Sequence, residues 1–115
     1  MKPGITIAEI GEHWPSGDYV VVAIVPIKSA DLVARLGAEL HAGIEDGLGP
    51  WVGIGIRLVS GDPIEFVQYE HASEPKGFEV RVDTESKAEK VLMEALNILQ
   101  SDLGKLAWVS ECIDA

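Results

Sequence analysis

Three histidines and a cysteine are the side chains of this sequence best suited to bind a transition metal: His13, His41, His71 and Cys112. Zinc sites usually take their ligands from closely spaced pairs, such as two cysteines or two histidines a few residues apart. The four candidates lie far apart along the chain and match none of these spacings. The sequence therefore predicts four separate residues, no metal site and no cofactor.

Two further groups could support chemistry on a small molecule. Glu12 and His13 are a neighbouring carboxylate and imidazole, which suit general acid–base catalysis when their loop folds over a pocket. Tyr69 and His71 point to the same side of a predicted strand and could bind a ligand at the mouth of a core. The sequence has no serine elbow, phosphate-binding loop or zinc-protease motif. It favours a protein that is not an enzyme.

The elements that position these residues are organised around a predicted β-hairpin over residues 51–71. A Gly/Asp/Pro turn signal at residues 60–63 separates two alternating runs. Alternation places one apolar set on the core face of the first strand: Val52, Ile54, Ile56 and Leu58. A two-residue turn at 61–62 pairs Ile56 with Val67 and Ile54 with Tyr69, which keeps apolar side chains together on that face.

The second face of the predicted hairpin is the candidate binding face. Its members are Trp51, Gly53, Gly55, Arg57, Phe66, Gln68 and Glu70. Glycines inside a strand mark either a bend or a place where another group approaches the backbone. Trp51 and Arg57 are the predicted anchors, because tryptophan and arginine are frequent among the residues that dominate binding at protein interfaces. The alternative for Trp51 is packing against the loop at Trp14-Pro15.

The remaining patterns predict two helices and further strands. Helical spacing of apolar residues runs over 29–45 and again from Thr84 to about residue 99, and strands are expected at 4–9, 19–27, 78–83 and 106–113. We therefore expect an α+β fold, a two-layer sandwich whose mainly antiparallel sheet of about five strands carries both helices on one face. The length of 115 residues predicts a single α+β domain spanning residues 1–115.

The charge of the chain restricts its partners. The 19 acidic residues outnumber the 9 basic ones and give a formal net charge of −10. Nucleic acids and anionic membrane surfaces both attract Lys and Arg, so neither is an expected partner. The longest apolar runs fall short of the roughly 18 residues that a membrane span needs. The single cysteine fits a reducing compartment and the first residues lack a signal-peptide pattern, so we expect a cytoplasmic protein.

Acidity without a catalytic motif predicts a protein-binding module. One form is an immunity-type inhibitor, which neutralises a basic partner protein through charge complementarity. The expected contact charges are Glu65, Glu70, Glu79 and Asp83. Trp51 and Arg57 are the expected anchors. Two alternatives stay open: a small-molecule-binding or enzymatic domain with a pocket near Tyr69 and His71, and a homodimer whose open sheet faces pack together.

Overall fold

The fold of this chain is given by a computed structural model that describes residues 5–8, 19–45, 47, 49–70, 77–84 and 87–111. The strands are β1 (Ile5–Ala8), β2 (Tyr19–Val25), β3 (His41–Glu45), β4 (Gly49–Leu58), β5 (Pro63–Tyr69), β6 (Phe78–Asp83) and β7 (Trp108–Val109). The helices are α1 (Ser29–Leu36) and α2 (Ala88–Ile98), followed by a short 3-10 helix, η1 (Leu103–Lys105). The predicted α+β two-layer arrangement is confirmed, with seven strands in the described part of the chain where about five were expected.

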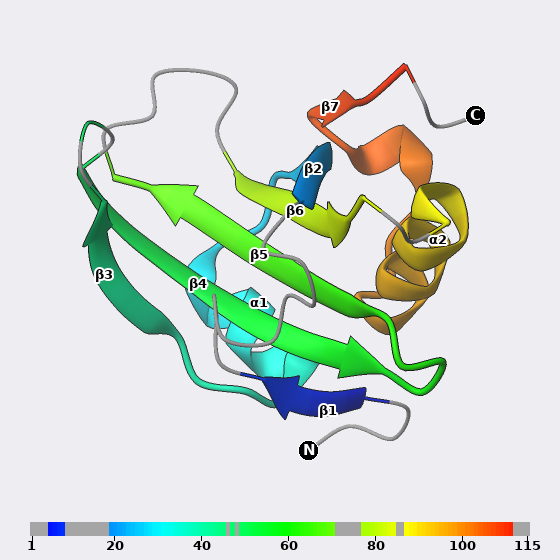
Figure 1. Cartoon of the computed structure of the whole chain (residues 1–115), viewed down its shortest axis with the longest axis horizontal. Helices are drawn as coiled ribbons and strands as arrows, with labels where there is room; N and C mark the ends of the chain where they lie inside the picture. Colours follow the sequence, from blue (N-terminus) through cyan, green and yellow to red (C-terminus); the bar gives the residue numbers. More distant parts are fainter. Residues whose placement is uncertain are drawn as a thin grey trace.

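The strands form one antiparallel sheet in the order β1-β4-β5-β6-β2-β7, and β3 also pairs with β4. β1 and β3 share one edge of the long strand β4, because β1 pairs with residues 55–58 and β3 with residues 49–53. Figure 1 shows these two short strands in line beside β4, at the margin of the molecule. The strand predicted at 4–9 is thus confirmed, and β3 is an additional element.

Both helices pack on the same face of the sheet. One cluster of buried apolar side chains joins them to β2, β4, β5 and β6. From the helices it contains Leu32, Leu36, Val91, Leu92, Ala95 and Leu96, and from the central strands Ile54, Ile56, Ile64, Phe66, Val80 and Val82. Val67 and Tyr69 are also buried but do not belong to this cluster, since they lie on the opposite face. We call that opposite face the helix-free face.

The helix expected at 29–45 is shorter than predicted. It ends at Leu36 because Gly37 adopts a left-handed conformation, with φ of 66°, and its N–H bonds to the carbonyl of Val33. This is the usual glycine cap of a helix C-terminus. Residues 41–45 then form β3, so the apolar residues at 40 and 44, which continue the helical spacing predicted over 29–45, do not belong to a helix.

The predicted register of the hairpin is wrong. Ile56 pairs with Ile64, and Ile54 pairs with Phe66. The Leu58 N–H bonds to the Asp62 carbonyl, which leaves residues 59–61 as the loop. A shift by an odd number of residues exchanges the two faces of a strand. Phe66 therefore lies in the core, fully buried, whereas Val67 and Tyr69 move to the helix-free face.

The ends of the other elements follow local chemistry. β2 ends before Pro26, as the missing N–H of proline predicts. Thr84 does not cap the second helix, since α2 begins at Ala88 and Lys87 occupies its cap position without a side-chain hydrogen bond. Gly77, at φ of 144°, lies so close to β2 that a Cβ there would be 2.4 Å from the Val25 carbonyl oxygen. A side chain at this position would therefore push β6 away from β2.

Candidate binding surface

The centre of the helix-free face carries charged residues that are buried. Glu65 of β5 and Arg81 of β6 are directly opposite each other, and their exposed fractions are 4% and 8%. Asp83, at 4%, lies on the same face two residues beyond Arg81. Glu65 and Asp83 were expected as exposed contact charges, and their burial corrects that expectation. Each has interaction partners within the protein, which buried carboxylates require.

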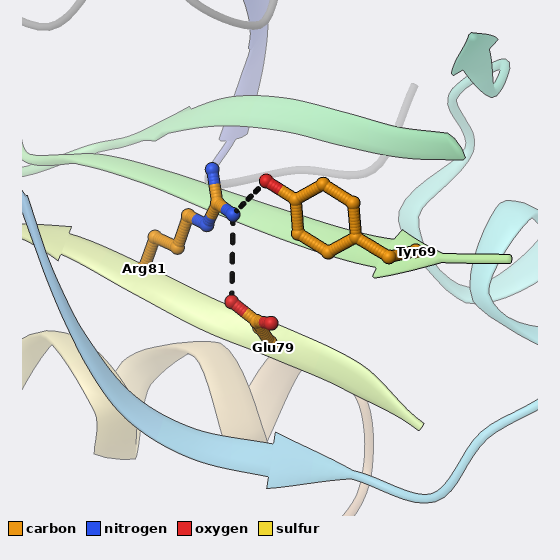
Figure 2. Close-up of polar contacts among 3 residues, drawn as sticks. All are labelled: Tyr69, Glu79 and Arg81. Carbon is orange, nitrogen blue, oxygen red and sulfur yellow. Dashed lines mark hydrogen bonds and ion pairs between the residues drawn. The ribbon is translucent and has the colours of Figure 1, made fainter. Parts of the chain in front are cut away.

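Arg81 is the residue around which this buried group is arranged. Its Nη2 donates a hydrogen bond of 2.7 Å to the hydroxyl of Tyr69 and lies 3.4 Å from the Glu79 carboxylate. Its guanidinium carbon lies 4.5 Å from the centre of the Tyr19 ring and 5.5 Å from that of Tyr69. Figure 2 shows the guanidinium reaching from β6 toward the Tyr69 hydroxyl on β5. Cation–π contact and hydrogen bonding together stabilise the buried charge.

The surroundings of Arg81 also affect its pKa. Burial alone lowers the pKa of the guanidinium, because it disfavours the charged form. The hydrogen bond to Tyr69 and the nearby Tyr69, Tyr19 and Glu79 raise it by more, so the net shift is upward. Arg81 therefore remains a fixed positive charge. Its Nε is buried and bonds to no residue in the described part of the chain, so the guanidinium retains one unused donor there.

The outer part of the helix-free face exposes apolar side chains beside one carboxylate. Ile24 of β2 is directly opposite Glu79 on one side and Trp108 of β7 on the other. Trp108 is 42% exposed, Tyr19 is 41% exposed, and the side chain of Glu79 is 29% exposed. We call these four residues, Tyr19, Ile24, Glu79 and Trp108, the aromatic rim. Because the Tyr19 ring is stacked on the buried Arg81, the position of Tyr19 within the rim is fixed by a contact inside the protein.

The predicted anchors have roles within the fold. Trp51 lies on the helix-free face as expected, opposite Tyr69, and is half-buried. Its indole covers Gly43 of β3 so closely that a Cβ there would be 2.6 Å from the ring. Arg57 donates a hydrogen bond of 2.7 Å to the carbonyl of Gly61 in the hairpin loop. Both side chains thus support the ends of β4, and neither belongs to the aromatic rim.

The other predicted residues fall in several places. Glu70 is exposed just after β5, and its N–H bonds to the carbonyl of Pro50. His41 is exposed on β3. His71 lies outside the described residues, as do His13, Trp14 and Cys112, so the metal and acid–base predictions stay untested there. Among the described residues no three His, Cys, Asp or Glu side chains gather closely enough to hold a metal ion.

Two pockets border the connection between β2 and α1. One, of about 390 Å³, is lined by residues that include Lys28, Ser29 and Gln68, and the other, of about 180 Å³, includes Arg35 and Lys105. Neither contains Tyr69 or His41, which the small-molecule hypothesis would place in one pocket. A cavity joining Tyr69 to His71 stays a prediction, because His71 is not described.

Three important residues of this surface were not among the predicted site residues: Tyr19, Arg81 and Trp108. A signal for Arg81 is present in the sequence, since alternation over 78–83 puts it on one face with Glu79 and Asp83. Tyr19 and Trp108 belong to strands that become neighbours only through a long-range pairing. The sequence pattern contains no information about that pairing.

Comparisons with known proteins add no family or relative: no family model, curated protein or solved structure matches this chain. A search of the described residues also finds no helix with the length and apolar character needed to cross a membrane. The functional argument therefore depends on the chemistry of the surface.

Proposed function

We propose that this protein is an acidic protein-binding module, of the immunity type, that inhibits a basic partner protein. The observation that carries the proposal is the aromatic rim, where Trp108 and Tyr19 are exposed on the same face as the Glu79 carboxylate, with Ile24 between Trp108 and Glu79. Tryptophan and tyrosine are among the side chains that most often dominate binding at protein interfaces.

The rim suits a lysine or arginine of the partner. A basic side chain could pair with the Glu79 carboxylate while its stem or guanidinium lies against the Trp108 ring. Glu79 is only weakly engaged within the protein, because its distance of 3.4 Å to Arg81 is long for a charged hydrogen bond. Its carboxylate therefore keeps capacity to accept a second donor.

The net charge supports the same class of partner. A charge of −10 on 115 residues attracts a basic protein over a distance and speeds the encounter. Close contacts at the rim would then determine how long the complex lasts. Glu70, an expected contact charge that is exposed, would contribute to attraction more than to close contact.

Affinity capture from an extract of the source organism, followed by mass spectrometry, tests this proposal. The wild type is compared with Trp108→Ala and Glu79→Gln. Val59→Ala serves as matched control, since Val59 is 82% exposed but lies in the hairpin loop, outside the rim. We expect one basic protein to be retained by the wild type and the control. Trp108→Ala should reduce its retention by about tenfold or more, and high salt should weaken it.

The proposal is wrong if the same proteins are retained by all four baits, or if none is retained. Retention that depends on Trp108 but is unaffected by salt would exclude a charge-complementary partner. Circular dichroism of each variant excludes loss of fold as the cause of a change.

A further inference from the structure

The outer edge of β3 is a second surface, separate from the aromatic rim. Within the described residues β3 pairs only with β4, and Figure 1 shows it at the margin of the molecule. His41 and Ala42 are exposed, and Ile44 is 81% exposed. Natural sheets usually protect an edge strand with charged side chains, above all lysine, or with proline or a bulge. β3 has neither Lys nor Pro, its one acidic residue is the last, Glu45, and it pairs with β4 in an unbroken register.

The pairing with β4 reveals which backbone groups point outward. Ile44 is directly opposite Pro50, which has no N–H and whose carbonyl accepts a hydrogen bond from Glu70 on the β5 side. Ile44 and Pro50 are therefore a pair without mutual hydrogen bonds. In an antiparallel ladder such a residue directs its N–H and C=O away from its neighbour. By alternation the same holds for Ala42, so Ala42 and Ile44 direct donors and acceptors to the outer edge of β3, where no described residue bonds to them.

We propose that this edge pairs with β3 of a second copy of the same chain, antiparallel about a two-fold axis at Gly43. That register places Ala42 opposite Ile44 of the other copy, so that the outward groups of both residues meet and each pair exchanges two backbone hydrogen bonds. This register pairs every residue of β3 with a residue of the other copy, whereas a register centred on Ala42 or Ile44 would leave some of them unpaired. A two-fold interface repeats each contact, as homodimers usually do.

The side chains of β3 suit this arrangement. Ile44, which is exposed in one copy, would be covered by the small Ala42 of the other. Gly43 would lie opposite itself at the centre, in a pair without hydrogen bonds, where strands approach most closely. On the side of β3 where a Cβ of Gly43 would lie, the Trp51 ring already fills the space, so no cavity forms there.

The inference is independent of the proposed function and differs from it in its response to salt. Two chains of charge −10 repel each other, so added salt should strengthen the dimer. Binding of a basic protein at the rim should instead be weakened. A five-residue edge buries little area, and the dimer should therefore be seen as a concentration-dependent equilibrium.

Sedimentation equilibrium over a concentration series into the millimolar range, at low and high salt, measures this equilibrium. Ile44→Lys and Ala42→Pro should each raise the dissociation constant by about tenfold or more. Ala42→Pro removes only an outward N–H, so pairing with β4 stays intact. Val59→Lys is the control, since it makes the same change at another exposed apolar residue. It should leave the dissociation constant unchanged.

Amide hydrogen exchange adds a test of the register. The N–H groups of Ala42 and Ile44 should exchange more slowly as protein concentration rises, whereas that of the exposed Val59 should not change. A wild type that stays monomeric at every concentration and salt would overturn the inference. So would Ile44→Lys and Val59→Lys with equal dissociation constants, or a dimer that forms without protection of Ala42 and Ile44.

Discussion

At the scale of single residues, Arg81 shows how a buried cation can be accommodated on a sheet. Removing a guanidinium from water is costly unless its donors and its charge find partners. Here two tyrosine rings and one tyrosine hydroxyl supply most of that compensation, and Glu79 supplies a longer contact. The upward shift in the pKa of Arg81 means that its contribution to stability is lost only when the pH rises into the strongly alkaline range.

Tyr69 lies closer to the Arg81 guanidinium than Glu79 does, and this difference gives a prediction for Tyr69. Tyr69→Phe removes the hydroxyl that accepts the 2.7 Å bond and leaves a buried charged donor without it. We expect a loss of about 1–3 kcal/mol in the free energy of unfolding, measured by urea denaturation. The matched variant Glu79→Gln alters the weaker and more exposed partner and should cost less than about 1 kcal/mol. A larger loss for Glu79→Gln would mean that the ion pair, and not the tyrosine, holds Arg81.

At the scale of elements, β3 depends on a packing contact across the sheet. Gly43 and Trp51 are directly opposite each other, and the indole fills the space where a side chain of residue 43 would lie. An aromatic residue that covers a glycine on a neighbouring strand pins the register of both. Gly43, which lies within the helix predicted over 29–45, is thus required by a strand.

Gly43→Ala tests this contact. The new Cβ would lie 2.6 Å from the Trp51 ring, so the indole must move away from β3. In a background of Trp14→Phe and Trp108→Phe, we expect the fluorescence of Trp51 to change toward that of a more exposed indole. Overpacking of this kind should also lower the free energy of unfolding by about 1–3 kcal/mol. Gly47→Ala is the control for the fluorescence alone: a Cβ at Gly47 has no atom within 4 Å, but its φ of 83° strains any side chain and lowers the free energy of unfolding by itself. It should leave the fluorescence unchanged.

At the scale of the whole molecule, the charge of −10 acts over distances comparable with the protein. The radius of gyration is 12.9 Å, whereas the Debye length is about 30 Å at 0.01 M salt and about 10 Å at 0.1 M. Charges on opposite sides of the molecule therefore repel each other at low salt but are screened at moderate salt. This repulsion opposes the compact state.

Added NaCl should accordingly raise the midpoint of thermal unfolding at neutral pH, as followed by circular dichroism. The same titration near the isoelectric point, about 4.5, is the control, because the net repulsion vanishes there. A midpoint that falls with salt at neutral pH would show that attractive pairs outweigh the net charge. Both measurements use dilute protein, so that self-association does not contribute.

Local patterns in the sequence were sufficient for the class of the fold and for several of its elements. The alternation in 78–83, the β-branched run before Pro26 and the apolar stripe of 88–99 each describe interactions between near neighbours along the chain. Such interactions are encoded by spacing alone. The acidic charge is likewise a property of composition, and it needs no structure.

Contacts between distant segments of the chain decided the register of the hairpin, the pairing of the strands and the burial of individual side chains. Phe66 and Tyr69 exchanged faces because Phe66 fits the core beneath the helices, which the turn signal at 60–63 does not report. Glu65 and Asp83 read as surface charges in the sequence, yet folding buries them beside Arg81. Trp108 joins Ile24 only through the pairing of β7 with β2. The physical reason is common to all three: packing energy depends on which side chains meet in space, and spacing along the chain does not specify that.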